Sequence, residues 1–142
     1  MSRLAAVGDR RPMSTTTSPR TRRALAAGSG FVALNAFAGG VALATGVIDL
    51  GPVVTDRLPS HSPVLAGLAL VLVVGAPMAV AARRAATGHP RWAGTAVFAG
   101  ACLVAWIAVQ LVVIRTFSWL QPVMAAAGVA VLLAGLRGIR KR

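Results

Sequence analysis

The stretch from Trp92 to Leu136, WAGTAVFAGACLVAWIAVQLVVIRTFSWLQPVMAAAGVAVLLAGL, decides the fold. It contains two apolar runs, residues 92–114 and 117–136, of twenty-three and twenty residues. A helix of about twenty apolar residues spans the hydrocarbon core of a bilayer. Only Arg115 and Thr116 separate the two runs. Two long helices joined by so short a turn must run in opposite directions, so the stretch predicts an antiparallel pair of transmembrane helices.

Two further apolar runs precede this pair. Residues 24–47 carry no charge, and residues 64–82 are equally apolar, with Pro77 near the end of the run. The strands of an outer-membrane barrel have about ten residues and alternate apolar with polar side chains, which none of these runs does. The sequence therefore predicts an all-α integral membrane protein. Its fold would be an antiparallel bundle of four transmembrane helices at about 24–47, 64–82, 92–114 and 117–136, in a domain covering 24–137.

The composition agrees with a membrane protein. Of the 142 residues 56% are hydrophobic and 13% are charged, whereas soluble domains average about 45–50% and about 25%. Fifteen residues are Lys or Arg and three are Asp or Glu, a balance that in a soluble protein would suggest nucleic acid. Because the basic residues lie outside the apolar runs, we expect lipid headgroups of the bilayer as their counter-charge, and no nucleic acid.

The positions of the basic residues predict the orientation. Six lie in residues 1–23, three in 83–91 and four in 137–142, and only Arg57 and Arg115 lie in the other two connections. Cytoplasmic segments are enriched in Lys and Arg, so both termini are expected in the cytoplasm. The preference for Arg over Lys, with abundant Ala, Gly and Val, is typical of a GC-rich bacterial genome, and the predicted location is the bacterial plasma membrane.

The two ends are predicted to be basic and cytoplasmic. Residues 1–23 lack apolar periodicity and predict a disordered arm, within which Met13 is an alternative start, and residues 138–142 form a short tail. The segment TRRALA, residues 21–26, also resembles a twin-arginine export signal. An uncleaved first helix is favoured, because the uncharged run is about twice as long as the apolar region of a signal peptide.

Five positions are candidates for a polar site inside the membrane. Asn35 lies at the midpoint of residues 24–47, where an amide needs a hydrogen-bond partner, so it predicts either a bond to another helix or a substrate ligand. Gln110 and Gln121 each lie about one turn below the outer surface, with Trp106 one turn below Gln110 on the same face. We expect an amide-to-amide clasp of the outer hairpin, with Arg115 in the turn. A ligand pocket that opens outward is the alternative.

Small residues recur every four positions in two of the runs. Ala36, Gly40 and Ala44 lie in the first run, and Ala126, Ala130 and Ala134 lie in the last. Such ridges favour a helix contact or a homodimer seam. An alanine-rich composition also produces this spacing by chance.

Catalytic chemistry has little support in the sequence. No Asp, Glu, Lys, Arg or His lies within the four runs, so the usual elements of a proton relay or an ion-coupled carrier are missing. Asp49, Asp56 and His61 share one loop, but their spacing matches no chelating motif. Cys102 is the single cysteine and is expected to be a packing residue. We therefore expect no catalytic residue, no metal and no cofactor, and no enzyme.

Three short segments carry a resemblance. LNAFAGGVAL (34–43), WIAVQ (106–110) and FSWLQP (117–122), in this order, resemble a group of small four-helix bacterial integral membrane proteins without an assigned function. The resemblance covers most of residues 30–136. It implies four transmembrane helices and supplies no activity and no functional residues.

Three functions remain open at this point. The favoured one is a structural or interaction protein that assembles with itself or with another membrane protein. The alternative is a passive channel or small-solute carrier that uses Asn35, Gln110 and Gln121, which would then converge on a water-accessible cavity. A membrane enzyme would require the outer loop to gather Asp49, Asp56 and His61.

Overall fold

The computed structural model describes residues 18–58, 61–115 and 119–141, and within these ranges it contains helices and turns but no strand. Four helical segments are long and apolar enough to cross a membrane. They are Pro19–Ala44, Pro63–Thr87, Trp92–Val113 and Leu120–Arg140. The prediction of an all-α protein with four such helices is thereby confirmed.

The helices follow one another along the chain with short connections. In order they are α1 (Pro19–Ala44), α2 (Gly51–Thr55), α3 (Pro63–Leu70), the π-helical segment η2 (Val71–Gly75), α4 (Ala76–Thr87), α5 (Trp92–Ile114) and α6 (Leu120–Arg140). The segments α3, η2 and α4 are continuous and form the second of the four long spans.

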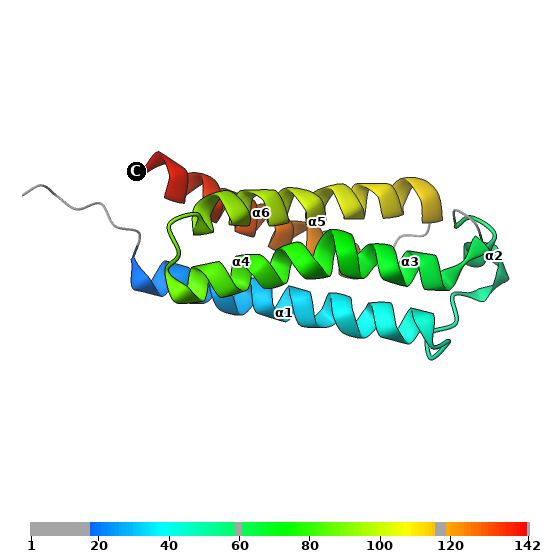
Figure 1. Cartoon of the computed structure of the whole chain (residues 1–142). Coiled ribbons are helices and arrows are strands. Elements are labelled where there is room, and N and C mark those ends of the chain that lie inside the picture. Colours follow the sequence, from blue (N-terminus) through cyan, green and yellow to red (C-terminus); the bar gives the residue numbers. More distant parts are fainter. Residues whose placement is uncertain (1–17, 59–60, 116–118, 142) are drawn as a thin grey trace, which may run out of the picture.

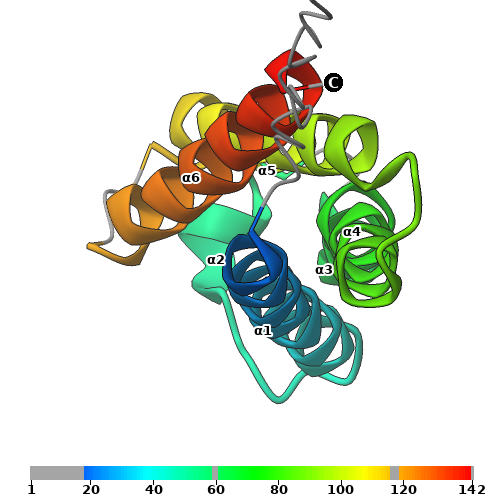
Figure 2. The same cartoon turned by 90° about the vertical axis from the view of Figure 1, so that its left-hand side faces the viewer.

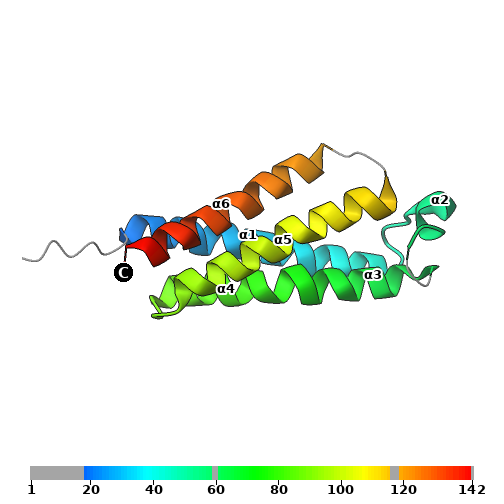
Figure 3. The ribbon, with the colours of Figure 1, turned by 90° about the horizontal axis from the view of Figure 1, so that it is seen from above.

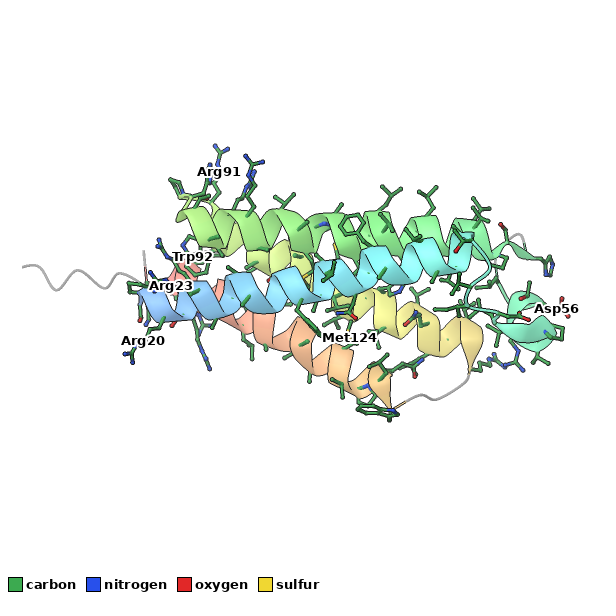
Figure 4. The ribbon with its side chains drawn as sticks, turned by 90° about the horizontal axis from the view of Figure 1, so that it is seen from below. Arg20, Arg23, Asp56, Arg91, Trp92 and Met124 are labelled. Atoms are coloured by element: carbon green, nitrogen blue, oxygen red, sulfur yellow. The ribbon has the colours of Figure 1, made fainter. Side chains whose placement is uncertain are left out.

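The four long spans lie side by side (Figure 1). The start of α1, the α4–α5 connection and the end of α6 lie at one end, and α2 lies at the other. Figure 4 shows Arg20, Arg23 and Arg91 together at the first end and Asp56 at the second. We call these the basic end and the α2 end. Seen along the bundle, α1 packs beside α3 and α4, and α6 packs beside α5 (Figure 2).

Helix α1 begins earlier than the apolar run. Pro19 occupies its first turn, where a missing N–H is tolerated. The Ser18 hydroxyl accepts a hydrogen bond from the backbone N–H of Arg20 at 3.3 Å. Residues 19–23 of the predicted arm are therefore helical, and residues 1–17 lie outside the described ranges. The helix ends at Ala44, three residues before the predicted end.

The last helix is displaced along the chain relative to its prediction. It begins at Leu120 rather than at Phe117 and continues to Arg140 rather than ending at Leu136. The α5–α6 connection is thus five residues long, and residues 116–118 of it lie outside the described ranges. Basic side chains near the C-terminus of a helix interact favourably with its dipole, so Arg137 and Arg140 extend α6 beyond the apolar run.

Proline accounts for the π-helical turn within the second span. Pro77 has no backbone N–H, and its ring would collide with the carbonyl of Val73 four residues earlier. The preceding turn is widened, so that the backbone N–H of Ala76 bonds to Val71, five residues back. The span then continues to Thr87, beyond the predicted end at residue 82. Gly88 at φ 68° closes it, with the N–H of His89 bonded to the carbonyl of Arg84.

Glycines bring the backbones of α5 and α6 into direct contact. A Cβ added to Gly100 would lie 2.7 Å from the carbonyl oxygen of Gly128, and one added to Gly135 would lie 2.7 Å from that of Ala93. The contact stripe of α6 is Gly128, Val131, Gly135 and Gly138, all buried. The ridge Ala126, Ala130 and Ala134 predicted from the sequence is not this contact, because Ala126 and Ala130 are exposed.

Helices α1 and α3 also come into direct backbone contact, at one pair of glycines. Gly40 of α1 and Gly67 of α3 face each other, and a Cβ on Gly67 would lie 2.6 Å from the carbonyl oxygen of Gly40. Ala36 and Gly40 of the first predicted ridge are buried in this contact region, whereas Ala44 is exposed. Toward the basic end the core is formed by larger side chains. These include Leu25, Val32, Val74, Met78, Trp92 and Leu103.

These contacts predict opposite effects for two Gly→Ala substitutions. Gly135→Ala should lower the free energy of unfolding by about 1–3 kcal/mol, because backbone atoms of α5 must shift. Gly94→Ala should keep or raise it, because a Cβ at Gly94 has no neighbour within 4 Å and alanine is favoured over glycine in a helix by about 0.8–1 kcal/mol. Thermal unfolding in detergent measures both. Equal loss of stability in the two variants would contradict the glycine contact.

Candidate functional site

Asn35 faces away from the bundle. Its side chain is exposed, and its Nδ2 donates a hydrogen bond to the carbonyl oxygen of Phe31 at 2.8 Å, one turn earlier in the same helix. The neighbouring Phe31 and Leu34 are about two-thirds exposed. The described residues contain no bond from Asn35 to another helix of the same bundle, because the amide bonds to the backbone of its own helix.

The outer face of α1 has a regular composition. We use this name for Ala24, Gly28, Phe31, Asn35, Ala38 and Ala42, of which all but the half-buried Ala42 are exposed. They are spaced by four and three residues in alternation, the spacing of a helix–helix seam. The buried side of α1 has a separate set, Leu25, Ser29, Val32, Ala33, Ala36 and Gly40. Helix α1 thus has one face in the bundle core and another on which an amide lies between Phe31 and Ala38, with further small residues beyond them.

The predicted amide clasp is not formed. Gln110 and Gln121 are both half-buried, and no hydrogen bond joins them in the part of the chain that the structure describes. Figure 3 shows why, since the end of α5 and the start of α6 lie apart at the α2 end. The glycine contacts hold these helices together from about the middle of their length to the basic end.

The remaining two candidates lie on α5. Trp106 is half-buried, and its indole Nε1 is buried without a hydrogen-bond partner among the described residues. Arg115 is the C-cap of α5, exposed, with a left-handed backbone at φ 53°. The structure therefore does not gather the five candidate positions into one site. Asn35 lies on the outer face of α1, and the other four lie on the α5–α6 hairpin.

The connection between α1 and α3 does not form a metal or catalytic centre in its described part. His61 Nδ1 lies 4.0 Å from Asp56 Oδ1, with both side chains largely exposed. Asp49 Oδ1 accepts a hydrogen bond from the backbone N–H of Gly51 at 2.8 Å, which makes it a local turn residue. Among the described residues no three His, Cys, Asp or Glu side chains lie close enough to hold a metal ion.

A groove lies on the outer surface of the bundle between α4 and α5. Its volume is about 750 Å³ and it is open to the surroundings. Small residues at Ala76, Ala93 and Gly94 leave room for it. Its other lining residues are Leu72, Pro77, Val80, Phe98 and Ile139, with Arg84, Pro90, Arg91 and Thr95 toward the basic end.

A threonine positions the guanidinium of Arg84, one of the two arginines that line this groove. Arg84 Nη1 donates to Thr95 Oγ1 at 2.7 Å, and the Thr95 hydroxyl donates to the carbonyl oxygen of Arg91 at 3.0 Å. Arg84 is half-buried and Arg91 is exposed. From the sequence, these arginines predict only the orientation of the chain in the membrane. The one sequence feature that could have indicated this contact was Thr95, which places a hydroxyl near the start of an otherwise apolar run.

The left-handed conformation of Arg115 gives a direct test of the turn. A non-glycine residue in this region carries a cost of about 1–2 kcal/mol. Arg115→Gly should therefore preserve or raise the free energy of unfolding, whereas Arg115→Val should lower it, because a β-branched side chain tolerates positive φ poorly. Thermal unfolding of both variants in detergent measures the difference. Equal stability of the two would show that this conformation is not kept in the folded protein.

Comparisons with models of known protein families, with curated proteins and with solved structures found no match for this chain. The resemblance to small four-helix bacterial membrane proteins therefore stays a prediction. The function has to be argued from the surfaces of the bundle itself.

Proposed function

We propose that the chain is a structural protein of the bacterial plasma membrane that assembles with a second copy through the outer face of α1. Its four long helices would cross the membrane as an antiparallel bundle, with the basic end and both termini in the cytoplasm. Four apolar helices support the multi-pass arrangement. The orientation is supported by the basic end, which carries Arg20, Arg23 and Arg91 (Figure 4).

The observation that carries this proposal is the exposed amide of Asn35. In a bilayer, Asn35 would lie near the middle of the apolar part of α1, where a polar group that lacks partners is costly. Within the described residues its single hydrogen bond is to Phe31. An asparagine amide offers two N–H donors and an acceptor oxygen. One N–H is used, so the amide can still bond to another chain packed on this face.

A second copy fits this face because the amide is self-complementary. Around a two-fold axis along the membrane normal, the two Asn35 side chains lie at the same depth and each can donate to the other. A single asparagine in a helix seam favours one register and one oligomeric state. Gly28, Ala38 and Ala42 on either side allow close approach of the two helices, as small residues do in membrane helix pairs.

The channel alternative loses its main support. It required Asn35, Gln110 and Gln121 to share a water-accessible cavity. The structure places Asn35 outside the bundle on α1, whereas the two glutamines lie near the α2 end of α5 and α6. The groove between α4 and α5 includes none of the three.

The proposal predicts a weaker dimer for Asn35→Leu. Two reciprocal hydrogen bonds of about 0.6–1.7 kcal/mol each correspond to about a tenfold to several-hundredfold increase in the dimer dissociation constant. Sedimentation equilibrium in a density-matched detergent measures this constant. Val129→Ala, an exposed substitution on α6, is the control and should leave it unchanged. Identical dimer dissociation constants for the wild type and Asn35→Leu would contradict a dimer interface at Asn35.

A single-cysteine variant identifies the occupant of this face. Asn35→Cys on a Cys102→Ser background should form a disulfide-linked dimer when membranes are oxidised, and Val129→Cys should not. Cross-linking to a protein of another size would replace the second copy with a different membrane partner. If Asn35→Cys is instead labelled from outside by a membrane-impermeant thiol reagent, water reaches mid-membrane, and the channel replaces assembly as the function.

A further inference from the structure

The groove between α4 and α5 combines an apolar trough with a basic end. Leu72, Val80 and Phe98 form its walls, and all three are 44–62% exposed. Arg84, in the last turn of α4, and Arg91, at the basic end in Figure 4, line the groove where it reaches that end. An elongated apolar molecule with one anionic group would match both parts. In a protein surrounded by a bilayer, the molecule of this kind at hand is a phospholipid.

We propose that this groove binds an anionic phospholipid of the cytoplasmic leaflet, with the phosphate at Arg84 and Arg91 and an acyl chain against the apolar walls. The proposal rests on the membrane insertion proposed above, and it does not depend on pairing through Asn35.

The length of the groove matches one leaflet. Leu72 and Arg84 are twelve residues apart on a continuous helical span, which corresponds to about 18 Å at a rise of about 1.5 Å per residue. Half of a bilayer's hydrocarbon core is about 15 Å thick. The groove thus extends from headgroup depth to about the middle of the membrane, which is the path of an acyl chain.

The arginine end has unused hydrogen-bonding capacity. A guanidinium has five N–H donors, and the bond from Nη1 of Arg84 to Thr95 uses one of them. This bond also holds the guanidinium over the groove rather than leaving it free in solvent. Arg91, the residue before α5, lines the same groove from the adjacent element. Two guanidinium groups on adjacent elements suit a phosphate, which accepts bidentate bonds from arginine.

Among the residues that the structure describes, no acidic side chain lies at this end. In the described ranges the acidic residues are Asp49 and Asp56, and both belong to the connection at the α2 end. Basic pockets between transmembrane helices on the cytoplasmic side are typical sites for anionic headgroups. A zwitterionic lipid carries a cationic group beside its phosphate, so a lipid with net negative charge is favoured.

Native mass spectrometry of the detergent-purified full chain tests the site. Phosphatidylglycerol and phosphatidylcholine with identical acyl chains are titrated in parallel. We expect phosphatidylglycerol to bind at least tenfold more tightly to the wild type. Arg84→Gln and Arg91→Gln should each weaken its binding by about fivefold. Arg137→Gln and Arg140→Gln, at the same end but outside the groove lining, are the matched controls and should each weaken it by less than twofold.

A second variant separates a lipid from a free phosphate ion. Gly94→Leu fills the apolar part of the groove, where a side chain at residue 94 meets open space, and leaves both arginines in place. It should abolish the preference for phosphatidylglycerol if an acyl chain lies there. Unchanged lipid binding in Gly94→Leu, or competition by inorganic phosphate at equal concentration, would overturn the lipid site. Equal losses in the groove and control arginine variants would also overturn it.

The same preparation distinguishes failure of this proposal from failure of the proposed function. If the wild-type chain is released from membranes by alkaline carbonate, membrane insertion fails and the lipid site fails with it. If the chain stays in the membrane and phosphatidylglycerol shows no preference, the lipid site alone is refuted. The dimerisation of the Arg84→Gln variant should equal that of the wild type in either case.

Discussion

Direct backbone contact at glycines is the interaction on which the arrangement of this bundle depends. Membrane helices gain nothing from excluding one another's apolar surface from water, because lipid chains are as apolar as leucine. Their association therefore relies on close packing. Gly100, Gly128 and Gly135 allow the backbone of α5 to touch that of α6, and Gly40 with Gly67 does the same for α1 and α3. The remaining contacts are built around these approaches.

Close packing of α5 against α6 near the basic end goes together with a wide separation of the two helices near the α2 end. The glycine contacts of α5 and α6 extend from about the middle of the helices to the basic end, and the helices separate toward the α2 end (Figure 3). The glutamines predicted to form a clasp lie in the separated half. Two polar side chains in the described helices bond to the backbone of their own helix or to the residue that caps it. Asn35 and Thr95 both bond to a carbonyl four residues earlier in the chain.

Two outward surfaces remain once the core is filled, and both proposals use them. The outer face of α1 has an amide between Phe31 and Ala38, and the groove between α4 and α5 has arginines at one end. They belong to different helices, so a second copy and a lipid need not compete. Pro77 and the π-helical turn before it contribute to the groove, since Leu72, Ala76 and Pro77 all line it. Local backbone geometry in α4 thus shapes a surface that the apolar run alone did not indicate.

The sequence alone determined the number and the approximate places of the long helices. Four uncharged runs of nineteen or more residues have few other stable structures, since backbone polar groups in hydrocarbon must be satisfied within the segment. The helix ends were less predictable, because caps such as Ser18 and the basic residues of α6 extend helices beyond the apolar run. The choice of Arg115 as a turn residue was correct, but the length of the turn was not.

Only the tertiary structure decided which face of each helix is inside. Asn35 and Ala36 are adjacent in the sequence and about 100° apart around α1, so one is exposed and the other is buried. No rule of spacing distinguishes a ridge that packs from one that faces outward, as Ala126 and Gly128 show on α6. The Arg84–Thr95 bond likewise depends on how the α4–α5 turn brings two helices together. Orientation about a helix axis is decided by packing against neighbours, and that information is spread over the whole bundle.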